Sequence, residues 1–218
     1  MLSQETPNAL GRITKLIGNI TVSNLEDEDG LSAKGDWDLG GGVSYGPPLV
    51  KTPDAASENN PWKRVLIPHP EFRRAPAHVE VYNPQSASTG EVDNASHQWA
   101  TLRWTENGDP VHGRWTNEAS VFLLDVFPTR LALLEREVNA GTAAPVPVWF
   151  PTLALSIDFK KVLPANGVNW LHSKVTTKSI RGGRMDVEVA LLDDSGDIIA
   201  LASHATLIMS SSRNRARI

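Results

Sequence analysis

Apolar and polar residues alternate along two stretches in the middle of the chain, residues 78–82 and 97–105, and turn-forming residues flank both. Such a two-residue period predicts half-buried β-strands. The period changes at residues 116–138, where apolar residues cover more than one face of a helix, with Thr116 as its N-cap and Glu118 in the first turn. The pattern therefore predicts two strands followed by one long helix.

Strand-like segments fill most of the chain after a proline-rich connector. The sequences "PANG", "RGGR" and "DDSGD" separate four of them, which are residues 151–162, 169–180, 184–194 and 197–210. Short turns between neighbouring strands predict an antiparallel meander. Because the helix is apolar on several sides, we expect the sheet to wrap around it rather than carry it at an edge.

Composition excludes several classes of protein. The 218 residues include no cysteine, so disulfides, zinc ribbons and thiol nucleophiles are excluded together. A net charge of −4 gives no general attraction to nucleic acid. No histidine has a neighbour in metal-site spacing, so we expect neither a metal nor another cofactor.

Two observations bear on location. No apolar stretch approaches the roughly 20 residues that span a bilayer. The first residues, "MLSQETPNALGR", lack the apolar segment of a signal peptide. We expect a cytoplasmic protein without membrane contact.

One carboxylate, Asp125, interrupts the apolar run "VFLLDVFPTRL". Pro128 cannot donate a hydrogen bond to the Leu124 carbonyl, so the helix should kink there and open space beside Asp125. Helical spacing puts Phe122 and Thr129 on the same face as Asp125. Periodicity leaves two interpretations open: Asp125 satisfies loose backbone at the kink, or it is a partly desolvated group held for chemistry.

Three segments carry a family resemblance. They are "FLLDVFP", "PTLALSIDFKKVLP" and "WLHSKVTTKSIRGGRMDVEVALLDDSGDIIALASHATLIM". In this order they resemble the C-terminal hotdog domain of the double-hotdog acyl-CoA thioesterases, over residues 77–211. The resemblance implies an α+β hotdog fold, in which an antiparallel β-sheet wraps around one long central helix.

The resemblance also implies site residues. In the family an Asp on the central helix, a Thr or Ser at the start of the next strand and a Gln late on the final strand hold the attacking water. These positions fall on Asp125, Thr152 and Thr206, and Thr206 departs from the family because its hydroxyl is shorter than a carboxamide.

The implied reaction is hydrolysis of an acyl-CoA or of a carrier-bound acyl thioester. Asp125 would act as general base, Thr152 would orient the water, and backbone amides at the kink would polarise the carbonyl. Phe122, Thr129 and Trp149 are the candidate substrate-binding residues, with Trp149 lining an acyl tunnel.

His204 opens an alternative. It lies two residues before Thr206, so strand alternation puts both side chains on one face. Hotdog dehydratases pair a histidine with a carboxylate, so Asp125 and His204 would catalyse dehydration, cyclisation or isomerisation of a polyketide-like intermediate. Two further interpretations stay open: a strand histidine that faces solvent or is merely hydrogen-bonded, and a domain that binds a ligand without turnover. His172 is a weaker candidate.

The predicted domain organisation has three parts. Residues 1–76 form one or more remnant strands of a first hotdog plus a Gly/Pro-rich linker, residues 77–211 form the hotdog domain, and residues 212–218 form a basic tail. The related proteins have two hotdogs in a chain, and here the first is largely missing. Because an uncovered sheet edge or face is normally buried, we expect a homodimer.

Overall fold

The computed structural model describes residues 2–8, 11–20, 52–53, 60–67, 74–85, 94–143 and 146–210. The chain divides into two units, Met1–Ala33 and Lys34–Ile218. The first unit contains an antiparallel hairpin of β1 (Leu2–Asn8) and β2 (Gly11–Gly18). The predicted basic tail and most of the predicted linker lie outside the described residues, so the predicted domain organisation stays a prediction.

The second unit contains the main sheet and both helices. Its elements are β3 (Trp62–Val65), the short 3-10 helix η2 (Pro76–His78), β4 (Val79–Pro84), β5 (Ala95–Glu106), β6 (Asp109–His112), α1 (Asn117–Leu123), α2 (Pro128–Val138), β7 (Val148–Trp149), β8 (Thr152–Phe159), β9 (Leu171–Arg181), β10 (Arg184–Leu192), β11 (Ile198–Leu207) and β12 (Met209–Ser210). All six strands that the hydrophobic pattern predicts are present. In this unit the pattern misses β3 and β6, which have four residues each, and β7, which has two.

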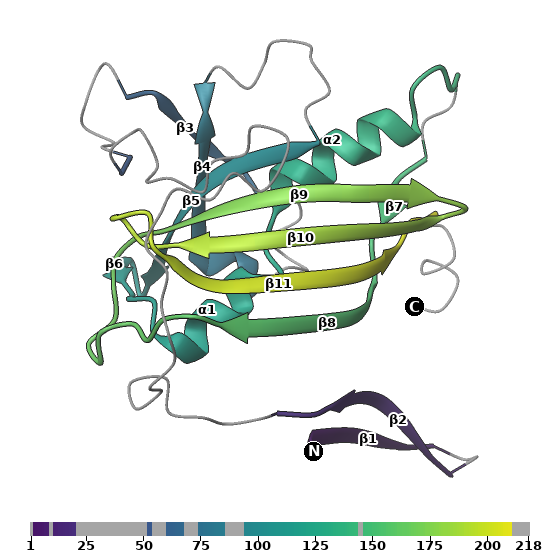
Figure 1. Ribbon diagram of the computed structural model, residues 1–218, viewed down its shortest axis with the longest axis horizontal. Helices are drawn as coiled ribbons and strands as arrows, with labels where there is room; N and C mark the ends of the chain where they lie inside the picture. Colours follow the sequence, from purple (N-terminus) through teal and green to yellow (C-terminus); the bar gives the residue numbers. More distant parts are fainter. Residues whose placement is uncertain are drawn as a thin grey trace, which may run out of the picture. The chain divides into compact units, whose positions relative to one another are not determined.

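The strands of the main sheet pair in the order β3-β4-β5-β9-β10-β11-β8, with β6 paired to β5. Every pairing is antiparallel, as predicted. The predicted meander is correct for β9, β10 and β11, but β8 pairs with β11 rather than with β9, so the segment "PANG" does not join neighbouring strands. Figure 1 shows β9, β10, β11 and β8 side by side, with α1 and α2 behind them. Strand β8, which follows the helices in the chain, is the last strand of this order and forms one edge of the sheet.

The predicted helix is present in two pieces. Thr116 caps α1 as predicted, since its side chain accepts a hydrogen bond from the Ala119 amide. Helix α1 ends at Leu123, and Pro128 is the first residue of α2. Pro128 has no N–H to continue the helical ladder, so the predicted kink is a full break over residues 124–127.

A continuous core fills the space between the helices and one face of the sheet, which we call the inner face. The core joins Leu123, Leu124 and Phe127 to buried residues of the sheet such as Val187 and Ala202. The opposite, outer face carries a separate aromatic cluster, with the buried members Trp62, Tyr82 and Trp99 and the partly buried Trp170. Alternation along β5 separates the two, because Trp99 lies between two residues, Gln98 and Ala100, that point inward.

The described helices also bear on the membrane expectation. None of them is long and apolar enough to cross a membrane.

Candidate functional site

The helix break leaves two backbone carbonyls without helical partners. In an uninterrupted helix, the Leu124 carbonyl would accept from residue 128, which is a proline, and the Val126 carbonyl would accept from the residue 130 amide. In the structure, His204 Nε2 lies 3.1 Å from the Leu124 oxygen, and Gln98 Nε2 lies 2.6 Å from the Val126 oxygen. Buried side chains of the sheet therefore replace the two helical hydrogen bonds.

Asp125 lies between these two carbonyls, at the surface. Its side chain is 51% exposed. The Thr152 hydroxyl of β8 donates to Asp125 Oδ1 at 3.2 Å, and His204 Nδ1 of β11 lies 3.5 Å from the same oxygen. Both of these contacts use Oδ1, so Oδ2 keeps its lone pairs for a water or a substrate.

A β-bulge aims Thr152 at Asp125. On β8, Ala154 pairs with Ala205 but Thr152 pairs with Thr206, so Leu153 has no partner in the register. Without the extra residue, Thr152 would point to the same side as Ala154, which is the outer face. The bulge instead turns Thr152 to the inner face, where it meets the carboxylate.

His204 is wholly buried behind Asp125, with no exposed side-chain area. Burial lowers the pKa of His204 below its ordinary value, while the Asp125 carboxylate and the hydrogen bond to the Leu124 carbonyl oppose the shift. In the neutral tautomer that donates through Nε2 to the Leu124 carbonyl, Nδ1 presents a lone pair toward Asp125. A proton taken up by Asp125 can therefore be shared with His204.

The structure does not bring Thr206 into a recorded contact with Asp125. Thr206 is buried, and its hydroxyl has no hydrogen-bond partner. His204, one inward position earlier on β11, is the strand residue beside the carboxylate.

The three candidate substrate-binding residues are placed differently. Phe122 is exposed at the end of α1, and Trp149 is exposed in β7, shortly before Thr152. Thr129 belongs to α2, and its hydroxyl accepts a hydrogen bond from Asn83 of β4. The helix break thus divides the face that periodicity predicts Asp125 and Thr129 to share.

Two observations bear on the surroundings of Asp125. The amides of Asp125 and Val126 donate to the carbonyls of Phe122 and Leu123, so these two amides are not available to polarise a substrate carbonyl. The described cavity of about 350 Å³ is not lined by Asp125. Asp125 is open to the surface beside the edge strand.

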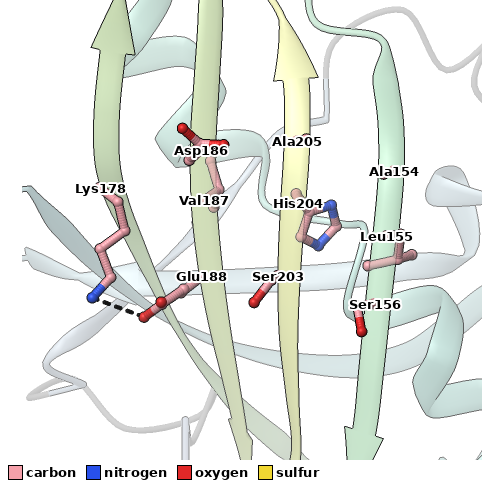
Figure 2. A pocket seen from close by; sticks show the side chains of 10 residues that line it. All are labelled: Ala154, Leu155, Ser156, Lys178, Asp186, Val187, Glu188, Ser203, His204 and Ala205. Atoms are coloured by element: carbon pink, nitrogen blue, oxygen red, sulfur yellow. Dashed lines mark ion pairs between the residues drawn. The ribbon is translucent and has the colours of Figure 1, made fainter.

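That cavity is a depression in the outer face of the sheet. Small residues of β8 and β11 form its floor, with Ser156 opposite Ser203, and Asp186 stands at its rim. Figure 2 shows Lys178 reaching toward Glu188 of the neighbouring strand, with 2.9 Å between Nζ and the carboxylate. The lining of this cavity also includes His204 of β11, the residue beside Asp125.

The other histidine of interest, His172, packs in the outer aromatic cluster. It stacks on His97 with 5.3 Å between ring centroids and meets Trp99 edge-on. Burial, together with the positive charges of His97 and Lys174, lowers the pKa of His172 to about 3. No carboxylate accompanies it among its recorded contacts. Within the described residues, no three His, Cys, Asp or Glu side chains are grouped to hold a metal ion.

Sequence reasoning missed one buried polar residue of the site, Gln98. A glutamine in the predicted strand at residues 97–105 would indicate a functional position only if its side chain were known to face the core. Apolar and polar residues alternate irregularly in that segment, so the sequence does not show which way Gln98 faces.

Comparison with known proteins gives one curated relative and several solved structures of similar fold. The thioesterase-like protein TwmA of Talaromyces wortmannii is 37% identical over 93 residues, which cover 42% of this chain and 27% of TwmA. A conserved protein of unknown function with a hot dog fold from Alicyclobacillus acidocaldarius superposes with a TM-score of 0.50 at 18% identity, over 82% of this chain and 59% of that one.

A protein from Novosphingobium aromaticivorans, proposed to be a thioesterase, gives a TM-score of 0.51 at 17% identity, over 84% of this chain and 58% of its own. These likenesses confirm the hotdog fold. The chain spans about a quarter of TwmA and somewhat more than half of each of these two solved chains.

The family comparison is more extensive. The sequence model of the acyl-CoA thioesterase C-terminal domain matches residues 48–208, which is well over half of the chain. The match includes Asp125, the β8 bulge and the whole of β11. The chain belongs to the acyl-CoA thioesterase C-terminal domain family.

Proposed function

We propose that the chain hydrolyses an acyl thioester, carried by CoA or by a carrier protein, with water activated by Asp125. The observation that supports this reaction is the half-exposed Asp125 carboxylate, anchored through Oδ1 by Thr152. Oδ2 accepts a proton from water as the water oxygen attacks the thioester carbon. The C–S bond then breaks, and the proton passes to the departing thiolate.

The exposed apolar side chains near Asp125 support an acyl substrate. Phe122 and Trp149 precede Asp125 and Thr152 by three residues each, and both side chains are exposed. We assign them to contact with the acyl chain. Roles for Thr129 in substrate binding and for Thr206 in holding water stay predictions.

We also propose that a second copy of the chain completes the site by pairing along β8. Within the described residues, β8 pairs only with β11, so one side of its backbone is unpaired. Leu153 and Leu155 of β8 are 54% and 38% exposed, and Val121 and Phe122 of α1 are exposed as well. A long edge strand with apolar side chains is a surface that proteins normally cover.

The substitution Leu155→Lys tests this interface. Light scattering of the unaltered chain should give a mass about twice the 23.7 kDa of one chain. The Leu155→Lys substitution should lower the measured mass toward that of a single chain. Leu201→Lys is the matched control, because Leu201 is similarly exposed at 36% but lies on β11, away from the edge. A monomer at micromolar concentration before any substitution would exclude the second copy.

Thiol release from a series of acyl-CoAs of increasing chain length tests the hydrolysis. The chain has no cysteine, so a thiol reagent reports only the CoA released. Asp125→Asn should lower kcat about 100-fold or more, in the range expected for loss of a general base. Asp158→Asn is the control, since Asp158 is an exposed carboxylate of the same strand, β8, paired to Lys160. Equal rates in Asp125→Asn and the unaltered chain would refute the proposal.

A second candidate function is proton transfer on a polyketide-like substrate, that is dehydration, cyclisation or isomerisation. The 3.5 Å approach of His204 Nδ1 to Asp125 favours it, because the pair can hold and return a proton. Because His204 is buried, a proton that moves between His204 and the substrate would have to pass through Asp125.

The substitution His204→Gln distinguishes the two functions. Glutamine retains an N–H for the Leu124 carbonyl but has no basic nitrogen. Hydrolysis should persist within about threefold in this variant, whereas dehydration of a 3-hydroxyacyl thioester should fall about 100-fold. A loss of hydrolysis as large as that in Asp125→Asn would instead assign His204 to the hydrolytic reaction.

A further inference from the structure

Gln98 is a buried polar residue that the proposed reaction does not use. Its side chain is 2% exposed, on the inner face of β5. Its amide nitrogen donates to the Val126 carbonyl at 2.6 Å, across 28 residues of sequence. A carboxamide at such a position is costly unless it is hydrogen-bonded, so an apolar residue would be expected if packing alone mattered.

Gln98 and His204 each form a hydrogen bond with one backbone carbonyl of the helix break. The two strands that supply these donors, β5 and β11, are separated in the sheet by β9 and β10. Gln98 of β5 holds the carbonyl of Val126, the residue directly after Asp125. His204 of β11 holds the carbonyl of Leu124, the residue directly before Asp125. The Asp125 backbone is thus held at both neighbours by a rigid sheet.

We propose that Gln98 is a positioning residue, which fixes the Asp125 carboxylate by holding the Val126 carbonyl. This inference rests on the proposed reaction, because it concerns the reactivity of the same carboxylate. The Asp125 side chain itself has only Thr152 and His204 as recorded partners, and half of it faces solvent. Its direction therefore depends on the backbone conformation of residues 124–127, and a displacement of about 1 Å at a reacting group can lower a rate about 100-fold.

The substitution Gln98→Met removes the donor and keeps the length of the side chain. We expect kcat for thioester hydrolysis to fall about 10- to 100-fold with KM within about twofold, since no contact with substrate is lost. Amide hydrogen exchange at residues 125–127 should become faster, while exchange in β9 and β10 stays unchanged.

Ser173→Ala is the matched control. Ser173 pairs directly with Gln98 in the register of β5 and β9, and it is 1% exposed. Its hydroxyl has no hydrogen-bond partner, so its removal should leave both kcat and exchange as in the unaltered chain. Should Gln98→Met fail to unfold cooperatively, Gln98→Asn serves instead, because its side chain is one methylene too short to reach the Val126 carbonyl.

The two measurements separate the possible outcomes. Fast exchange at residues 125–127 together with reduced kcat supports the positioning role. Exchange in Gln98→Met equal to that in Ser173→Ala overturns it, and so does an unchanged kcat in an active enzyme. If the unaltered chain releases no thiol from any acyl-CoA, the proposed reaction fails, and the exchange result alone then decides whether Gln98 holds the Asp125 segment.

Discussion

The two faces of the sheet each bury a histidine, and the surroundings of the two differ. His172, on the outer face, is enclosed by aromatic rings and has no carboxylate among its recorded contacts. His204, on the inner face, donates to a carbonyl and faces the carboxylate of Asp125. Burial lowers the pKa of both, but only His204 has a neighbouring acid that opposes the shift. A buried histidine therefore gains a chemical role from its partner rather than from burial.

The largest expected effect comes from replacing each histidine with phenylalanine. His204→Phe leaves the Leu124 carbonyl without a donor, so the break should relax and kcat for thioester hydrolysis should fall about 100-fold. The unfolding free energy should also drop by about 1–3 kcal/mol, the range for an unsatisfied buried carbonyl. His172→Phe should keep kcat within about twofold. Steady-state kinetics and urea unfolding measure both, and equal kcat values in the two variants would contradict this contrast.

A smaller effect should appear in the pH dependence of stability. The folded-state pKa of His172 is about 3, below that of an unfolded histidine near 6.5. Between these two pKa values, His172 binds a proton in the unfolded chain but not in the folded chain. The folded state therefore loses stability as pH falls from about 6.5 toward 3. The loss attributable to His172 is about 1.4 kcal/mol per pH unit well below 6.5, or roughly 2 kcal/mol at pH 5.

Urea unfolding at pH 7 and at pH 5 checks this contribution. His172→Phe should lose less stability between the two pH values than the unaltered chain, because phenylalanine binds no proton and suits an aromatic cluster. Identical losses in both proteins would mean that His172 is protonated in the folded state.

The smallest effect concerns the coupling between Asp125 and His204. The Asp125 carboxylate raises the pKa of His204 against the larger effect of burial. Asp125→Asn should therefore lower the pKa of His204 further and leave that of His172 where it is. NMR titration of the imidazole carbons measures both histidines in one sample. A rise in the pKa of His204 would exclude the carboxylate as its electrostatic partner.

An interruption of the helix at Pro128 was predictable from the sequence because its cause is local, although the sequence predicted a kink and the structure has a full break. Pro128 has no N–H wherever it is placed, so a helix that runs into it must lose the bond to Leu124. Gln98 was not predictable, because its importance depends on which face of β5 turns inward and on where the Val126 carbonyl lies. The hydrogen bonds of the Asp125 and Val126 amides to the Phe122 and Leu123 carbonyls were not predictable either, because they depend on how the chain turns at the break.

The hydrophobic periods of the chain determined the order of strands and helices, and the segments that resemble the thioesterase family determined the fold. Only the tertiary structure decided which side chains reach Asp125. A bulge at Leu153 turned Thr152 inward, and the register of β11 placed His204 rather than Thr206 beside the carboxylate. The physical reason is range: periodicity records the average burial of a face, whereas a hydrogen bond requires two atoms from distant segments to meet within about 3 Å.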